Sequence, residues 1–377
     1  MNINDYLRKY NNTPFEELEF NELDSLILSE LSYMNLDLYV PRLCDNKFVT
    51  LSEIQITDSK AFSYGSVDYK NNLRMFDLMR SGERFKNMQI GLYKEGLNVK
   101  DSKNAKQFFA VTFLLPNNTL YLSFRGTDIT INGWKEDFHL CLKDTIPSQD
   151  SALKYTKNVL KKYKLPFYLG GHSKGGNLAF YSALNLSSKR LEKRLITAYS
   201  FDGPGFKNGI KDFPSYKEIK HKLVKYMTHR DLVGMIYNEF KKGAIIISAT
   251  GILLGGHDPF TWRVNVNKAR FIRGRRNKVY VNSEVAFNKW LVSLKDEDKV
   301  LACDMIFDLL KEAKTVYDLP KAVGYTIVHG KEFVDSYSND EKDRVKEIVK
   351  KLIKIYFEIN FKPKKKSKQA SLLKSES

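Results

Sequence analysis

Residues 166–177 read PFYLGGHSKGGN, an apolar stretch that runs directly into glycines gathered around one serine. PFYLG is typical of a short buried strand, and NLAFYSAL, which follows the glycines, is typical of a helix. Between them, residues 171–175 fit the pattern Gly-x-Ser-x-Gly, in which a strand turns sharply into a helix and the serine is strained. The sequence therefore predicts that Ser173 is held out as a nucleophile. The alternative is a glycine-rich turn with an incidental serine.

A serine nucleophile needs a histidine to accept its proton and a carboxylate to orient that histidine. Of the six histidines, His257 is the best candidate, because its loop, GGHDPFTW, follows the serine in the chain and leads into a predicted strand. His172 is adjacent to Ser173, so its side chain should point away from the site. The alternative for His257 is a loop histidine without a role.

The carboxylate should come from residues 174–256 if the chain order is Ser, Asp, His. Asp202 in SFDGPGF and Asp231 in YMTHRDLVG both follow strand-like runs. Asp231 is favoured because it lies one strand later, where its carboxylate can reach the histidine loop. Asp202 stays open as the second candidate.

The oxyanion of an acyl-transfer intermediate needs N–H donors that are already in place. The main-chain N–H of Lys174, directly after the serine, can supply one. Thr127, in TLYLSFRGTD after an earlier strand, can supply a second N–H and a hydroxyl.

Strands and helices alternate around this motif. QFFAVTFLL and TLYLSF flank a turn-forming PNN at 116–118 and predict a hairpin or two adjacent strands. Further strands are predicted at 166–170, 196–201, 223–228 and 262–266, with helices at 151–164 and after the serine. This alternation predicts an α/β sheet that is parallel over at least part of its width.

The domain organisation follows from a change in periodicity. Residues 14–282 should form the sheet domain, and 283–361 a helical extension, because apolar positions there recur at helical spacing. Ser338 and Glu341 form a capping-box pattern before the last helix. Residues 362–377 have the lysine-rich composition of a disordered tail.

Composition excludes several classes of protein. Of the 377 residues, 42% are hydrophobic and 13% aromatic, which predicts a globular core. The N-terminus lacks the pattern of a secretory signal, and no apolar run is long enough to span a bilayer. Three widely spaced cysteines fit neither a disulfide framework nor a zinc site and suit a reducing cytoplasm. No metal and no cofactor are expected.

The net charge of +18 allows contact with anionic lipid, nucleic acid or acidic ligands, or only aids solubility. The basic run ARFIRGRRNK at 269–278 could hold a phospholipid head group, although a solvated loop is the default interpretation. Nucleic acid is not favoured, because no aromatic platform or helix-turn-helix pattern accompanies the charge.

The segments LSFRGT, GGHSKGGNLA, YSFDGPGF and THRDLVG occur in an order that resembles the class 3 lipase family of α/β-hydrolases. Over residues 15–290 the chain is similar also to a bacterial domain-of-unknown-function family of lipase-like proteins. The resemblance implies an α/β-hydrolase fold, a triad of Ser173, Asp231 and His257, and an oxyanion hole lined by Thr127 and Lys174.

The same resemblance implies two features near the site. Arg125 should pair with a buried carboxylate such as Asp137, and residues 128–149 lie where class 3 lipases carry a lid. That segment could form an amphipathic flap or an ordinary helix on the core. Only 25 residues separate Asp231 from His257, so we expect a reduced cap over the site.

The sequence thus predicts a cytoplasmic serine hydrolase that cleaves a carboxylic ester, such as a lipid or lysophospholipid. The alternative is a catalytically idle α/β-hydrolase scaffold that binds lipid or protein through its basic surface.

Overall fold

The computed structural model describes the chain in separate segments. These segments are residues 1–62, 69–98, 106–127, 140, 142–186, 188–230, 233–238, 243–251, 254–309 and 335–361. The predicted tail at 362–377 lies outside them, and so do most of the predicted lid segment and Asp231.

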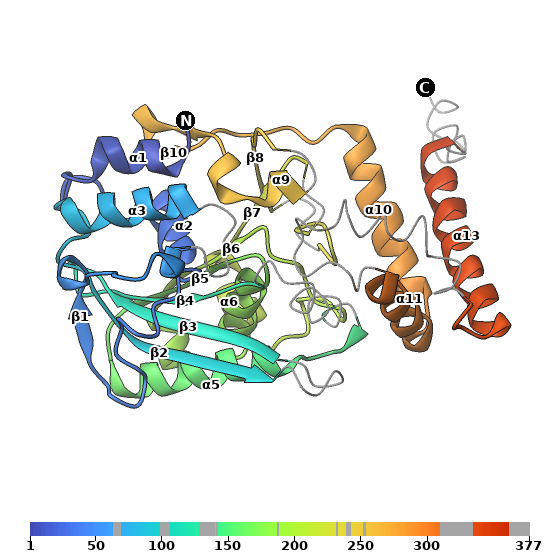
Figure 1. Ribbon diagram of the computed structural model, residues 1–377, viewed down its shortest axis with the longest axis horizontal. Helices are drawn as coiled ribbons and strands as arrows, with labels where there is room; N and C mark the ends of the chain where they lie inside the picture. Colours follow the sequence, from blue (N-terminus) through green and yellow to red (C-terminus); the bar gives the residue numbers. More distant parts are fainter. Residues whose placement is uncertain are drawn as a thin grey trace, which may run out of the picture.

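The described residues form one sheet of eight strands in the order β1 to β8, so that every strand lies beside its neighbours in sequence (Figure 1). The first four strands pair antiparallel and the last four continue the sheet in parallel from β4. Their bounds are β1 Phe48–Thr50, β2 Gln89–Asn98, β3 Lys106–Leu114, β4 Leu120–Phe124, β5 Phe167–His172, β6 Leu195–Phe201, β7 Leu223–Thr228 and β8 Ile245–Ile247. The mostly parallel sheet confirms the predicted α/β-hydrolase-like fold.

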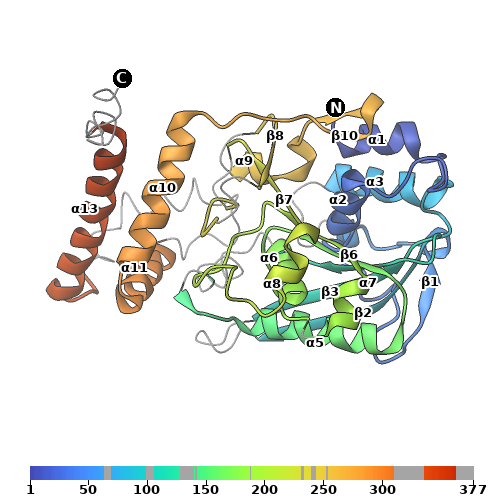
Figure 2. The same cartoon turned by 180° about the vertical axis from the view of Figure 1, so that it is seen from behind.

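Helices cover both faces of this sheet. One face carries α1 (Ile3–Tyr10), α2 (Glu22–Leu31) and α3 (Tyr69–Ser81), and the other carries α5 (Pro147–Lys162) and α6 (Lys174–Leu184) (Figure 1). The short helices α7 (Lys189–Arg194) and α8 (Tyr216–Ile219) lie on the side of α6 (Figure 2). No helix in the described part of the chain has the length and apolar character that crossing a bilayer requires.

The two faces bury separate hydrophobic clusters, and strand β3 contributes side chains to both of them. Phe109, Val111 and Phe113 belong to the cluster under α1, α2 and α3. Phe108 and Ala110 belong to the cluster under α5 and α6. This is the alternation expected of a strand, because successive side chains point to opposite faces of a sheet.

The strands and helices predicted around the serine motif are present. The structure differs from the prediction where the sequence pattern was weak. The hairpin of β3 and β4 forms as predicted. Strand β2 was not predicted; its pairing with β3 shifts register between Gly91 and Lys94, which breaks the alternation. The strand predicted at 262–266 is shorter, and β9 (Val264–Asn265) pairs with β10 (Arg270–Phe271) outside the main sheet.

The C-terminal helices α10 (Lys278–Ser293), α11 (Asp296–Leu309) and α13 (Asn339–Phe361) lie together at the end of the molecule away from α1. The boundary predicted at residue 283 falls inside α10. The predicted capping box is present, with the Glu341 N–H donating to Ser338 Oγ at 3.3 Å and the Ser338 N–H donating to Glu341 Oε2 at 2.9 Å.

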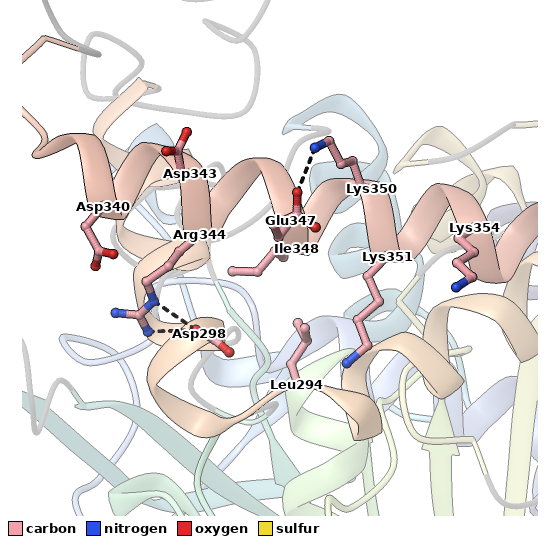
Figure 3. A pocket seen from close by; sticks show the side chains of 10 residues that line it. All are labelled: Leu294, Asp298, Asp340, Asp343, Arg344, Glu347, Ile348, Lys350, Lys351 and Lys354. Atoms are coloured by element: carbon pink, nitrogen blue, oxygen red, sulfur yellow. Dashed lines mark hydrogen bonds and ion pairs between the residues drawn. The ribbon is translucent and has the colours of Figure 1, made fainter.

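Polar contacts fasten α13 to its neighbours. Arg344 donates to Asp298 of α11 at 2.6 Å, and the indole of Trp290 on α10 donates to the Ile348 carbonyl at 2.9 Å. Figure 3 shows the groove along α13, about 550 Å³ in volume, whose lining is mostly charged. None of the predicted site residues lines this groove.

A buried ion pair anchors the N-terminal helices to the rest of the fold. Arg84, between α3 and β2, donates through two nitrogens to Asp24 of α2, at 2.9 and 2.5 Å, and both side chains are fully buried. The same guanidinium donates to main-chain carbonyls of the segment before α2, those of Thr13, Leu18 and Glu19. Because the Arg84 guanidinium donates hydrogen bonds both to Asp24 and to the segment before α2, it fixes the position of α2 against the sheet.

Removing one partner of this pair should be costly, because the other charge stays buried without compensation. We expect Asp24→Ala to lower the free energy of unfolding by about 3–5 kcal/mol in urea denaturation. Glu83→Ala is the control, since Glu83 pairs with Lys86 at an exposed site, and it should cost less than about 1 kcal/mol. Equal, small losses in both variants would contradict the anchoring role.

Candidate active site

Ser173 occupies a strained turn between β5 and α6. Its backbone has φ of 57° and ψ of −132°, a conformation that residues with a side chain rarely adopt. Its N–H donates to the Phe201 carbonyl of β6 at 2.9 Å. The serine is 8% exposed, at the N-terminus of α6. The turn therefore has the conformation that the Gly-x-Ser-x-Gly pattern predicts.

The glycines around the serine are required by close backbone approach. A Cβ added at Gly171 would lie 2.4 Å from the carbonyl carbon of Gly175, and one at Gly175 would lie 2.0 Å from the Phe124 oxygen. A Cβ added at Gly126 would lie 3.0 Å from the Cβ of Ser173, and closer still to the Tyr33 hydroxyl and the His172 carbonyl oxygen. The end of β4 and the start of α6 thus pack directly against the turn.

The parallel strands bring three predicted site residues to one edge of the sheet. Because β4 to β7 run parallel, their carboxyl ends meet, and this edge is where α/β proteins place their sites. Thr127 follows β4, Ser173 follows β5 and Asp202 follows β6. His257 ends the short helix α9 (Leu254–His257) and joins them at this edge.

Asp202 is the carboxylate that contacts His257. Its Oδ2 lies 3.2 Å from His257 Nδ1, and its Oδ1 accepts from the Thr228 N–H at 3.3 Å. The residue is fully buried, with φ of 53°. A Cβ at Gly234 would lie 2.4 Å from Oδ1, so the backbone at residue 234 also packs on the carboxylate.

Asp231, the carboxylate that the sequence favoured, lies outside the described residues, so its role stays a prediction. Asp202, the second candidate, lies within them and contacts His257. It directly follows β6 and has a positive φ.

Both oxyanion candidates lie close to the serine. Lys174 is the first residue of α6, where main-chain N–H groups have no partner within the helix. Gly126 packs against Ser173, which brings the next residue, Thr127, to the same turn. The Thr127 side chain is only partly buried.

Arg125 is buried below this turn, with its guanidinium carbon 3.0 Å from the centre of the Phe109 ring. Its predicted partner Asp137 lies outside the described residues. Residues 128–139 of the predicted flap at 128–149 also lie outside them, whereas Leu140 and Leu142 within it are buried and its last residues begin α5.

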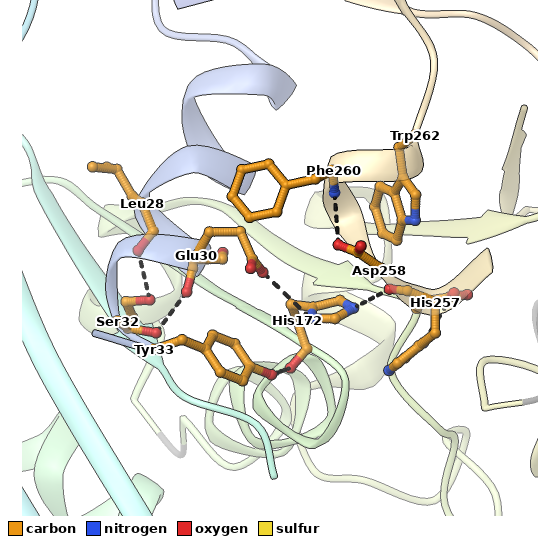
Figure 4. Close-up of polar contacts among 12 residues, drawn as sticks. Leu28, Glu30, Ser32, Tyr33, His172, His257, Asp258, Phe260 and Trp262 are labelled. Carbon is orange, nitrogen blue, oxygen red and sulfur yellow. Dashed lines mark hydrogen bonds and ion pairs between the residues drawn. The ribbon is translucent and has the colours of Figure 1, made fainter. Parts of the chain in front are cut away.

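One polar pair behind the elbow was not predicted. The His172 side chain lies between α2 and His257: its Nδ1 lies 3.3 Å from Oε1 of Glu30 on α2, and its Nε2 lies 2.9 Å from the His257 carbonyl (Figure 4). The Tyr33 hydroxyl donates to the His172 carbonyl at 3.1 Å. The available signal was Glu30 near the end of FNELDSLILSEL, directly after a run of apolar residues that predicts a buried helix face.

Burial favours the neutral form of both side chains in this pair. Burial raises the pKa of the Glu30 carboxyl well above its ordinary 4.5; nearby Asp258 raises it further, whereas His257 lowers it. Burial also lowers the pKa of His172 well below its ordinary 6.5, and the neighbouring His257 lowers it further. The two shifts therefore act in the same sense, toward a protonated Glu30 and an uncharged His172.

The other potential ligands do not gather into a metal site. Within the described ranges, no group of three or more His, Cys, Asp or Glu side chains could hold a metal ion. His229 lies at the end of β7, where its Nδ1 accepts from the Ala249 N–H at 3.4 Å, and His221 is exposed.

The sheet and its serine elbow together define an α/β-hydrolase-like fold. The model of the Mbeg1-like family matches residues 79–308, and the chain belongs to the Mbeg1-like family. A comparison with curated proteins gave no match.

Solved lipase structures resemble parts of the chain. M37 lipase is 16% identical, with a TM-score of 0.38, over 58% of this chain and 71% of its own. Lipase II from Rhizopus niveus is 14% identical, with a TM-score of 0.33, over 62% and 80%. The Rhizomucor miehei lipase in its propeptide complex is 20% identical, with a TM-score of 0.31, over 44% and 57%.

The raised pKa of Glu30 predicts how stability depends on pH. Between pH 4.5 and the raised value, the folded protein keeps a proton that the unfolded chain has released, so wild-type stability falls as pH rises. Glu30→Gln removes this titration. We expect its free energy of unfolding, relative to wild type, to rise by up to about 1.4 kcal/mol per pH unit in this window, measured by urea denaturation. A difference that stays constant across this window would show that Glu30 is ionised in the folded protein.

Proposed function

We propose that the protein is a serine hydrolase that cleaves a carboxylic ester through Ser173, His257 and Asp202. The observation that carries this proposal is the contact of 3.2 Å between His257 and Asp202 at the sheet edge where Ser173 adopts its strained conformation. A solvated loop histidine without a role would not need a buried aspartate beside its ring. A histidine oriented by a carboxylate is what a serine needs to become a nucleophile.

The proton pathway follows from which imidazole nitrogen faces the carboxylate. An ionised aspartate can only accept, so Nδ1 of His257 carries the hydrogen at the Asp202 contact. Nε2 is then the atom that takes the proton of the Ser173 hydroxyl as its oxygen attacks the acyl carbonyl. Asp202 stabilises the imidazolium that results, and His257 returns the proton to the leaving alcohol.

The developing oxyanion would be held by main-chain donors. The N–H of Lys174 lies in the first turn of α6, where the helix dipole favours negative charge. We assign the second donor to Thr127, because Gly126 packs against Ser173. Water then attacks the acyl-enzyme, with His257 as the base, and releases the acid. No step needs a cofactor.

The substrate class rests on the sequence motifs around the site. Their resemblance to class 3 lipases favours an ester with an acyl chain, such as a lipid or lysophospholipid. A series of p-nitrophenyl esters of increasing chain length would measure the preferred acyl length directly.

The nucleophile can be tested with a fluorophosphonate probe. We expect wild type to be labelled, and Ser173→Ala to lose both labelling and at least about a thousandfold in ester turnover. Ser182→Ala is the matched control, because Ser182 is buried on the same helix but away from the elbow, and it should be labelled normally. A folded wild-type protein that neither labels nor cleaves esters would favour the idle scaffold instead.

The acid can be assigned by comparing two substitutions. Asp202→Asn removes the charge that fixes the His257 tautomer, so we expect kcat to fall by about ten thousandfold. Asp231→Asn should change kcat by less than about tenfold. The reverse order, with the large loss at Asp231, would give the role to Asp231 and contradict the assignment of Asp202.

A further inference from the structure

The backbone that carries His257 is fixed by two buried side chains at consecutive carbonyls. The Trp262 indole donates to the Gly256 carbonyl at 3.0 Å, and His172 Nε2 lies 2.9 Å from the His257 carbonyl. The His172 and Trp262 rings themselves meet edge-on, with centroids 5.7 Å apart. Two adjacent peptide groups held in this way leave the backbone of His257 little conformational freedom. That backbone determines where the imidazole side chain starts and in which direction it points.

The contact with a carbonyl also determines where the His172 hydrogen lies. A carbonyl oxygen only accepts, so Nε2 must be the donor, and Nδ1 of the neutral ring is then an acceptor. Nδ1 faces Glu30 Oε1 at 3.3 Å, longer than a strong hydrogen bond. Only a protonated carboxyl can present a hydrogen to that nitrogen. An ionised Glu30 would draw a proton to Nδ1, as an imidazolium or as the tautomer whose Nε2 cannot donate.

We propose that His172 is a positioning residue: its Nε2–H holds the main-chain carbonyl of His257, and protonated Glu30 keeps His172 in the tautomer that can do so. This inference rests on the proposed triad of Ser173, His257 and Asp202. It assigns a role in the reaction to two side chains that do not touch the reacting atoms. The opposite directions of the pKa shifts of Glu30 and His172 agree with a neutral pair.

Neutrality of this pair matters because the two imidazoles lie close together. The ring centroids of His172 and His257 lie 4.5 Å apart, at an interplanar angle of 36°. His257 becomes an imidazolium during the reaction, and a second positive charge at this distance would oppose it. Among the described residues, the charged groups near these rings include Asp258, which follows α9, and Asp202, which contacts Nδ1 of His257. A neutral His172 leaves the carboxylate of Asp202 to stabilise the imidazolium.

The experiment compares substitutions at His172 that keep or remove the donor, with a short-chain p-nitrophenyl ester as substrate. His172→Phe keeps a ring but has no donor, so kcat should fall about 10- to 100-fold while KM stays within about twofold. His172→Gln places an amide N–H near the position of Nε2 and should recover most of the loss. His221→Phe, the same change at an exposed histidine, is the control and should leave kcat unchanged.

The pH profile supplies a readout that a merely structural role would not move. As the pH rises and Glu30 ionises, wild-type kcat should decline, whereas Glu30→Gln cannot ionise and should lack this decline. In parallel, ¹⁵N NMR of wild type should show the His172 hydrogen on Nε2. This measurement decides the tautomer even where a variant fails to fold.

Three results would overturn the proposal while the triad stands. These are wild-type kcat in a folded His172→Phe protein, equal losses in the Phe and Gln variants, and a hydrogen on Nδ1 in the NMR spectrum. If Ser173→Ala retained full turnover, the triad itself would fail, and the positioning role would fail with it.

Discussion

The rest of the site depends on the strained backbone at Ser173. Positive φ at a residue with a side chain costs free energy, of order 1–3 kcal/mol, and persists only where its surroundings leave no alternative. Here the constraint comes from close packing, because the ends of β4 and the start of α6 approach the turn closely enough to exclude any side chain at positions 126, 171 and 175. The same turn puts the serine at the sheet edge that receives Asp202 from β6 and His257 from α9.

The helix behind the elbow is held by polar contacts as well as by apolar packing. The hydroxyls of Ser25 and Ser29 on α2 both lie within 2.9 Å of the Tyr121 hydroxyl on β4, in an interface that is otherwise mostly apolar. Glu30 continues this polar row to His172. Apolar packing alone would allow a helix to slide or rotate on a sheet, whereas directional contacts of this kind fix one position. The direction of the His257 backbone therefore depends on a helix more than two hundred residues earlier in the chain.

Features set by residues close together in the sequence could be predicted, whereas contacts between residues far apart in the chain could not. The elbow, the β3–β4 hairpin and the central strands were predictable, since glycine spacing and runs of apolar residues are local signals. Chain order and the loop pointed to His257, which the structure places beside Asp202. Chain order favoured Asp231 and left Asp202 open, because it does not show which strand end a loop folds over. The Glu30–His172 contact could not be derived, because it joins residues far apart through tertiary packing, and burial of a single glutamate leaves no periodic pattern.

The buried pair of Asp24 and Arg84 has a consequence for where this fold can be divided. The family match begins at residue 79, so it includes Arg84 but leaves out α2 with its aspartate. A fragment cut to the matched span would carry a bare guanidinium and an uncovered sheet face, and it would lack the glutamate beside His172. The recognisable family core is accordingly not a transferable module. The chemistry proposed for it requires the N-terminal helices, and a chimera built from this fold would have to keep them from the same parent.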